Sequence, residues 1–303
     1  MGGFGVIVNA APAGRYMRKQ FRILAKRRAE QKTVSIKHGF RHGSSAKPAA
    51  DRTGKMTECR FFNSPSGRRL AYVQQKGAEP GVVFLGGFKS DMQGSKALFL
   101  EAWAKRQGRA FLRFDYSGHG QSSGKFVDGT IGGWAQDAVE IVTALTRGPQ
   151  VVVGSSMGGW IALLLAKELP SRVQGLVGIA AAPDFTEDSV WADLDEAQRQ
   201  AMWRDGQVEL PSEYDDSPYI FTRRLIEDGR AHLVLRAPLG LPFPVRLLQG
   251  SEDASVKASV PLRILAHASC DDMRLTFVKG ADHRFSSPEC LNLIEAAVGE
   301  VSR

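Results

Sequence analysis

The chain has 303 residues, of which 43% are hydrophobic, 24% are charged and 9% are aromatic. This length and composition suffice for a sizeable buried core and exclude a wholly disordered protein. The longest apolar stretches, residues 160–166 and 175–182, fall far short of the ~20 residues that a membrane-spanning helix needs, so we expect no membrane span.

The net charge of +8 comes from one end of the chain. Residues 1–55 hold 13 Lys and Arg but only two acidic residues, whereas the remainder is slightly acidic. The body of the chain therefore has no basic stripe that could follow a phosphate backbone, and we expect no nucleic-acid partner.

The three cysteines are too few, and too far apart, for a disulfide framework or a zinc site. Cys59, Cys270 and Cys290 form no C-x-x-C pair. We expect unpaired thiols in a reducing compartment. No metal or cofactor is expected.

Residues 1–55 differ in composition from everything that follows them. Met17, Phe21 and Leu24 are spaced as on one face of a weak basic helix. Two interpretations stay open: an organelle transit peptide, or a disordered basic tail or mis-assigned start upstream of Met56. In either case the folded domain is expected to span residues 56–303.

From residue 60 onward, short β-branched runs alternate with longer helical patterns. The expected strands cover residues 69–73, 82–85, 110–114, 151–153, 176–180, 245–248 and 275–278. The expected helices cover residues 95–107, 133–146, 158–169, 256–267 and 288–301. Strands that are apolar throughout and alternate with helices predict an α/β fold with a doubly wound, mostly parallel sheet, which binds ligands at the carboxyl ends of its strands.

A long segment, residues 183–244, interrupts this alternation. A small lid insertion over about residues 184–243 is expected, and the alternative is a helical excursion that packs on itself. Its aromatic residues are expected to line an apolar acyl pocket: Trp191, Trp203, Tyr214, Tyr219 and Phe221.

The strongest motif is G-x-S-x-G, with Ser156 between Gly154 and Gly158. It directly follows the valine-rich strand and directly precedes a helix, which is the context of a nucleophilic serine on a sharp turn. The neighbouring Ser155 lacks the glycine frame, so Ser156 is the predicted nucleophile.

A serine nucleophile needs a histidine base, and three histidines follow it in the chain. His283 lies in the loop after the last strand, at the carboxyl edge of the sheet, and is the predicted base. His267 ends a helix and His232 lies where the lid ends. His119 precedes the nucleophile, so a structural role is expected for it.

The acid that orients the base should follow the strand at residues 245–248. Asp253 is the predicted acid, with Glu252 beside it as the alternative, and either carboxylate could instead cap the next helix. Asp184, after the preceding strand, is an outside candidate.

Acyl transfer also needs donors for the oxyanion. The backbone amide of Met157, next to the nucleophile, is one predicted donor. The amide of Phe88, in the loop at residues 86–90, is the other, unless that loop is only a glycine-rich connection.

Residues 57–303 resemble the α/β-hydrolases. The stretches at 94–98, 111–120 and 151–160 most resemble the group of mitochondrial palmitoyl-protein thioesterases and acyl-glucuronide esterases, together with its bacterial relatives. The resemblance implies that this group's serine–aspartate–histidine triad falls on Ser156, Asp253 and His283. It also implies hydrolysis of thioesters on acylated cysteines and of acyl glucuronide esters.

We therefore expect a cofactor-independent serine hydrolase that acts through an acyl-enzyme on a small-molecule ester or an acylated protein. A serine peptidase, a carbon–carbon bond hydrolase and a non-catalytic binding scaffold are the alternatives. The expected location is the cytoplasm in a bacterium or the mitochondrial matrix in a eukaryote.

Overall fold

The structure, a computed structural model, describes residues 58–211 and 218–303. The chain divides into two units, Met1–Met56 and Thr57–Arg303, and the described residues all belong to the second unit. The expected basic extension at residues 1–55 lies outside the described residues. No helix in the described part of the chain is long and apolar enough to cross a membrane.

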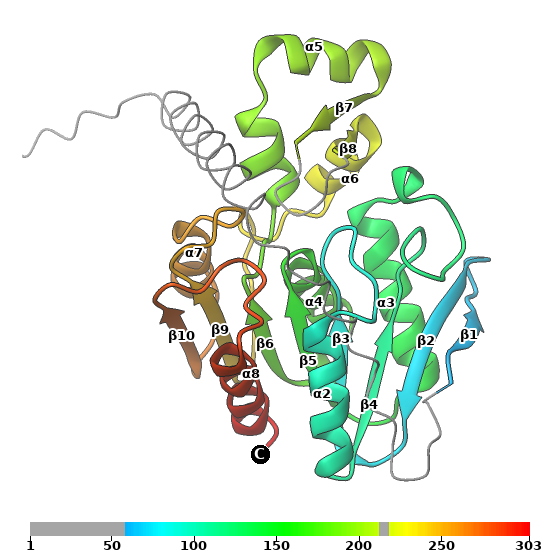
Figure 1. The fold of residues 1–303 in the computed structure, drawn as a ribbon, viewed down its shortest axis with the longest axis vertical. Coiled ribbons are helices and arrows are strands. Elements are labelled where there is room, and N and C mark those ends of the chain that lie inside the picture. Colours follow the sequence, from blue (N-terminus) through cyan, green and yellow to red (C-terminus); the bar gives the residue numbers. More distant parts are fainter. Residues whose placement is uncertain (1–57, 212–217) are drawn as a thin grey trace, which may run out of the picture. The chain divides into compact units, whose positions relative to one another are not determined.

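The centre of the unit is an eight-stranded sheet with the order β1-β2-β4-β3-β5-β6-β9-β10 (Figure 1). The strands are β1 (Arg60–Asn63), β2 (Arg69–Gln75), β3 (Ala78–Leu85), β4 (Arg109–Phe114), β5 (Gln150–Ser155), β6 (Val173–Ile179), β9 (Val245–Gly250) and β10 (Met273–Val278). Strands β1 and β2 run antiparallel to their neighbours, and every other pair in this sheet is parallel. This arrangement confirms the expected fold class.

Helices cover both faces of the sheet. They are α2 (Ser95–Arg106), α3 (Ile131–Leu145), α4 (Met157–Glu168), α7 (Ser259–His267) and α8 (Pro288–Val301). Side chains alternate along a strand, so Val151 and Val153 pack in the cluster with α2 and α8, whereas Val152 packs in the cluster with α3 and α4. Burial on both faces is why these strands read as unbroken apolar runs.

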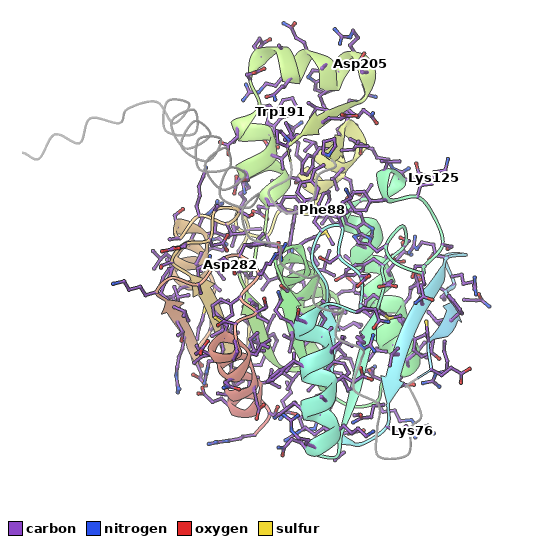
Figure 2. The ribbon with its side chains drawn as sticks, in the orientation of Figure 1. Lys76, Phe88, Lys125, Trp191, Asp205 and Asp282 are labelled. Atoms are coloured by element: carbon purple, nitrogen blue, oxygen red, sulfur yellow. The ribbon has the colours of Figure 1, made fainter. Side chains whose placement is uncertain are left out.

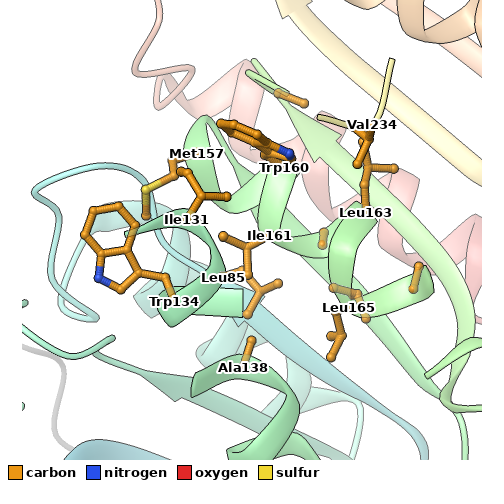
Figure 3. Close-up of a cluster of buried hydrophobic side chains, with 14 of the residues drawn as sticks. Leu85, Ile131, Trp134, Ala138, Met157, Trp160, Ile161, Leu163, Leu165 and Val234 are labelled. Atoms are coloured by element: carbon orange, nitrogen blue, oxygen red, sulfur yellow. The ribbon is translucent and has the colours of Figure 1, made fainter. Parts of the chain in front are cut away.

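The cluster under α3 and α4 positions the turn that carries the predicted nucleophile. Figure 3 shows Ile131 and Trp134 of α3 beside Met157 and Trp160 of α4. These four side chains are fully buried. Core packing therefore positions the first turn of α4 independently of the hydrogen bonds at the site.

Between β6 and β9 the chain leaves the sheet and forms the segment that we call the lid, residues 183–244. Its elements are a π-helical turn (Thr186–Trp191), α5 (Glu196–Asp205), β7 (Gln207–Leu210), β8 (Tyr219–Thr222) and α6 (Arg223–Ala231). Strands β7 and β8 form an antiparallel pair separate from the main sheet. In Figure 1 these elements lie beyond the carboxyl ends of the parallel strands.

An ion pair between a buried carboxylate and a partly exposed arginine joins the start of the lid to residues 234–236. Asp184 is fully buried and accepts hydrogen bonds from the backbone amides of Val234 and Leu235, at 2.8 and 3.1 Å. Its Oδ2 atom also lies 2.7 Å from Nη1 of Arg236. Asp184 therefore ties the start of the lid to the segment that follows α6.

All seven expected strands and all five expected helices are present, with ends shifted by a few residues. Strands β1, β7 and β8 were not expected from the sequence. Each has only four residues, and all three pair antiparallel outside the central, fully buried part of the sheet.

Candidate active site

Ser156 lies at the sharp turn between β5 and α4. Its backbone has φ 55° and ψ −119°, a region that residues with a side chain rarely adopt. The turn leaves no space at Gly158, because a side chain there would collide with the carbonyl oxygens of Leu85 and Gly86. Glycine at the frame positions is thus a steric requirement of this turn.

Backbone hydrogen bonds hold Ser156 in this conformation. Its amide donates to the carbonyl oxygen of Ile179 at 2.9 Å, and its carbonyl oxygen accepts from Gly159 and Ala182 at 2.9 and 3.0 Å. The surrounding structure therefore over-determines a strained residue, which is a recurrent feature of functional sites.

His283 reaches the serine from the loop after β10. Its Nε2 atom lies 3.1 Å from Oγ of Ser156. The loop is fastened to the turn after β9, because Gly280 donates to the hydroxyl of Ser251 at 2.8 Å and Glu252 donates to the carbonyl oxygen of Ala281 at 3.0 Å. The imidazole is 15% exposed, so it is sheltered but still accessible.

Asp253 lies behind the imidazole and is 1% exposed. Its Oδ2 atom is 2.9 Å from Nδ1 of His283 and 2.8 Å from the side-chain amide of Gln249. Its Oδ1 atom accepts hydrogen bonds from the amides of Ser255 and Val256 at 2.9 and 2.8 Å. Both oxygens of the buried carboxylate are therefore satisfied.

The structure thus brings together the predicted nucleophile, base and acid, which are distant in sequence. The alternative carboxylates lie elsewhere. Glu252 is exposed, and Asp184 forms the ion pair with Arg236 in the lid.

The other histidines also have different partners. Nδ1 of His232 lies 2.8 Å from the carbonyl oxygen of Asp228, and Nε2 of His267 lies 2.8 Å from that of Ala237. Neither contacts the serine.

The loop after β3 borders the serine on another side. A methyl group at Gly87 would lie 3.4 Å from Cβ of Ser156. The amide of Lys89 donates to Nε2 of His119 at 3.3 Å, and Nδ1 of His119 lies 3.2 Å from the carbonyl oxygen of Ser117. His119 is therefore a structural support of this loop, and burial lowers its pKa to about 4, so that it is neutral at pH 7.

A pocket of about 530 Å³ opens over Ser156 and His283. Phe88 and Met157, whose amides are the predicted oxyanion donors, are among the residues that line it. Because α4 begins at Met157, that amide has no acceptor within its own helix.

The lid contributes some of the expected aromatic side chains to this pocket, but not all. Tyr219 and Phe221 line it, together with Phe185, which the sequence had not indicated. Trp191 and Trp203 do not line it; they pack against each other with ring centroids 6.2 Å apart, and Trp203 is 51% exposed. In Figure 2, Phe88 lies below the lid elements and Trp191 lies higher on them. Tyr214 lies outside the described residues.

A lysine also borders the pocket. Nζ of Lys96, near the start of α2, donates to the carbonyl oxygen of Arg284 at 2.5 Å and thereby holds the loop that carries His283. Burial lowers the pKa of Lys96 to about 8, although Asp282 opposes that shift.

Among the described residues, no group of three or more His, Cys, Asp or Glu side chains could hold a metal ion.

A family model described as alpha/beta hydrolase fold matches residues 82–233, which is half of the chain. The chain belongs to the alpha/beta hydrolase family. It is therefore a hydrolase, and the sharp serine turn at the end of β5 is the place where this fold carries its nucleophile.

Two curated relatives of this hydrolase carry the name palmitoyl-protein thioesterase ABHD10, mitochondrial. The protein from Rattus norvegicus is 33% identical over 246 residues, which cover 81% of this chain and 82% of the relative. The protein from Homo sapiens is also 33% identical, with 81% of this chain and 80% of the relative covered. This finding confirms the resemblance noted from the sequence.

Solved structures of similar fold and sequence include relatives of the same kind. A chain from Agrobacterium vitis S4 has a TM-score of 0.79 and 38% identity, over 82% of this hydrolase and 100% of that chain. Alpha/beta hydrolase domain-containing protein 10 from mouse has a TM-score of 0.76 and 32% identity, over 80% of this hydrolase and 98% of that chain.

Three residues of the site had no role in the sequence-based interpretation. Gln249 is a polar residue within an otherwise apolar strand. A buried polar side chain needs a hydrogen-bond partner, so this pattern could have indicated a bond to the acid. Phe185 and Lys96 lack such a signal, because only the folded chain shows which way a loop or helix-start residue faces.

Proposed function

We propose that this hydrolase cleaves carboxylic esters or thioesters through an acyl-enzyme on Ser156. The proposal rests on one observation: an unbroken hydrogen-bonded series from the Ser156 hydroxyl through both ring nitrogens of His283 to the buried carboxylate of Asp253. This series is what an alcohol requires to act as a nucleophile at neutral pH.

In the first half of the reaction, Oγ of Ser156 attacks the substrate carbonyl carbon while its proton passes to Nε2 of His283. Asp253 accepts a hydrogen bond from the Nδ1–H group of the ring, which selects the reactive tautomer and stabilises the imidazolium. The amides of Met157 and Phe88 donate to the developing oxyanion. As the tetrahedral species collapses, the carbon–oxygen or carbon–sulfur bond breaks and the leaving group takes the proton from Nε2.

In the second half, a water molecule replaces the leaving group. His283 removes a proton from the water as its oxygen attacks the acyl carbon, and the ester bond to Oγ breaks. The proton then returns to Ser156, which frees the carboxylic acid and restores the starting state.

We further propose that the acyl donor is a long-chain thioester on a protein cysteine, and that acyl glucuronides are accepted as well. The name of the relatives supports the first of these. Apolar and aromatic side chains line one side of the pocket, which suits an acyl chain: Met157, Phe185, Val190, Tyr219 and Phe221.

A fluorophosphonate probe and a substrate panel test the proposal. The probe should label Ser156, and Ser156→Ala should abolish labelling and lower kcat by roughly 10⁶-fold. The panel contains an S-palmitoylated peptide, an acyl glucuronide, a short aryl ester, an unmodified peptide and a carbon–carbon hydrolase substrate. Turnover of only the last two would overturn the ester and thioester assignment.

Two further variants test the acid. Asp253→Asn should lower kcat by about 10⁴-fold, because the amide stabilises the wrong tautomer of His283. Glu252→Gln, its matched neighbour, should leave kcat within about twofold because the side chain it alters is exposed and not part of the series. A larger loss for Glu252→Gln would reassign the acid.

We propose the mitochondrial matrix as the location if the source is a eukaryote, and the cytoplasm if it is a bacterium. The name of the curated relatives and the basic composition of residues 1–55 support this proposal. Mass spectrometry of the native N-terminus tests it, because a transit peptide would be missing from the mature protein.

A further inference from the structure

Phe88 joins the oxyanion loop to the lid. Its amide is the proposed oxyanion donor, and its ring lies among five aromatic rings. Two of these, Phe126 and Trp134, belong to the body of the fold, with centroids at 4.8 and 6.0 Å. The other three rings belong to the lid.

The lid rings cover the other side of Phe88. Phe221 is stacked parallel to it, with a centroid distance of 5.2 Å and an interplanar angle of 5°. Tyr219 and Phe185 contact it edge-on at 5.8 and 5.7 Å. Each such pair contributes about 0.5–1.5 kcal/mol beyond the burial of apolar area, so the lid supplies much of what fixes this ring.

The loop needs support from outside itself. Residues Gly87 to Ser90 form a turn closed by a bond from the Ser90 amide to the Gly87 carbonyl oxygen, at 3.2 Å. Lys89, inside the turn, has φ 58°, the left-handed region that favours glycine. A non-glycine residue keeps such a conformation only where its surroundings impose it.

Contacts on both sides of the loop help to impose it, among them the bond from the Lys89 amide to His119 and the aromatic rings around Phe88. The first belongs to the body of the fold. The second depends on strand β8 of the lid, which carries Tyr219 and Phe221.

We propose that Phe221, supported by Tyr219, is a positioning residue for the oxyanion hole: its ring, stacked on Phe88, holds the Phe88 amide toward the reacting carbonyl. This inference rests on the proposed function and deepens it. It makes the lid part of the machinery that stabilises the transition state, and not only a wall of the acyl pocket.

The test separates transition-state stabilisation from substrate binding. Phe221→Leu keeps an apolar side chain but removes the stacked ring, and Phe221→Tyr retains the ring. Trp203→Leu is the matched control, since this lid aromatic does not line the pocket. The substrate is p-nitrophenyl acetate, whose short acyl group has little to gain from the lid.

Complete loss of an oxyanion donor lowers kcat by about 10²–10³-fold, so a loosened donor should cost on the order of tenfold. We expect Phe221→Leu to lower kcat about tenfold with KM within twofold, and Phe221→Tyr and Trp203→Leu to stay within threefold of the parent enzyme. Tyr219→Leu serves as a second variant if Phe221→Leu does not fold, with a smaller loss expected.

Two ligands provide an independent readout. A short alkyl trifluoromethyl ketone forms a tetrahedral oxyanion adduct on a serine, and the corresponding alkyl amide does not. In Phe221→Leu, affinity for the ketone should fall by the same factor as kcat, while affinity for the amide stays within twofold.

Unchanged kcat, or equal weakening of both ligands, would overturn the inference and leave Phe221 as a pocket wall. Different outcomes would contradict the positioning role of Phe221 and the nucleophilic role of Ser156. If Ser156→Ala is inactive and Phe221→Leu keeps full kcat, only the positioning role is wrong; if Ser156→Ala stays active, the proposed function and this inference both fall.

Discussion

The side-chain amide of Gln249 donates to Oδ2 of Asp253 at 2.8 Å, the same oxygen that lies 2.9 Å from Nδ1 of His283. Gln249 is fully buried in strand β9, and its Oε1 atom has no hydrogen-bond partner among the described residues. A glutamine that leaves its own acceptor unsatisfied is committed to its donor role. It holds the carboxylate in line with the imidazole.

Replacement of Gln249 by methionine should therefore weaken both stability and turnover. A hydrogen bond to a charged acceptor contributes about 1.5–3 kcal/mol, so the free energy of unfolding in urea should fall by about that much. We expect kcat to fall on the order of tenfold as Asp253 gains freedom. Gln174→Met is the control, because within residues 58–211 and 218–303 its side chain hydrogen-bonds only to the carbonyl oxygen of Arg303. Equal losses in the two variants would argue against a specific role.

The backbone of Ser156 stores strain that glycine should release. A non-glycine residue in such a conformation costs about 1–3 kcal/mol. Ser156→Gly and Ser156→Ala should both be inactive, but chemical denaturation should show the glycine variant to be more stable than the alanine variant by about 1 kcal/mol or more. Equal stability of the two would mean that the turn is not strained.

His119 should make the fold sensitive to acid. Burial lowers its pKa from 6.5 to about 4, so between these pH values the unfolded chain binds more protons than the folded one. The stability that neutral His119 provides is complete above pH 6.5 and is lost as the pH falls toward 4.

The comparison variant is His119→Gln, which keeps a side-chain acceptor for the Lys89 amide without titrating. Between pH 7.5 and 4.5 the parent protein should lose roughly 2–3 kcal/mol more unfolding free energy than this variant. Parallel pH profiles for the two proteins would show that His119 does not titrate as described.

Asp184 should matter for stability and not for chemistry. Asp184→Asn removes the charge that Arg236 and two backbone amides share, and should lower the free energy of unfolding by about 3 kcal/mol. At a temperature where the variant is folded, kcat should stay within threefold. Asp205→Asn, in an exposed pair with Arg204, should change stability little. A large loss of kcat in folded Asp184→Asn would make Asp184 a candidate for the catalytic acid again.

The central sheet and the serine turn were predictable because each depends on local patterns. Val151 to Val153 are apolar throughout, and the glycine-framed serine follows them directly. The same pattern placed His283 and Asp253 at the ends of neighbouring strands, so their meeting with Ser156 follows from the topology of a parallel sheet.

The lid was less predictable, because its geometry depends on tertiary contacts. Trp191, Trp203 and Phe221 look equivalent in the sequence, yet only Phe221 faces the pocket. The short strand β8 that carries Phe221 has no distinct pattern of its own, and its partner β7 is fixed only by pairing. Phe185 also lines the pocket; it directly follows Asp184, whose backbone has φ 59°.

Strands β6 and β9 are parallel, hydrogen-bonded neighbours, so the lid joins two adjacent strands and no other strand of the main sheet lies between them. The lid therefore has the form of an exchangeable cassette. It could be replaced by the lid of a relative without removing a strand from the main sheet. The stack on Phe88 sets the condition for such a graft. A donor cassette that lacks a ring at the position of Phe221 should give an enzyme that still binds new substrates but turns them over slowly.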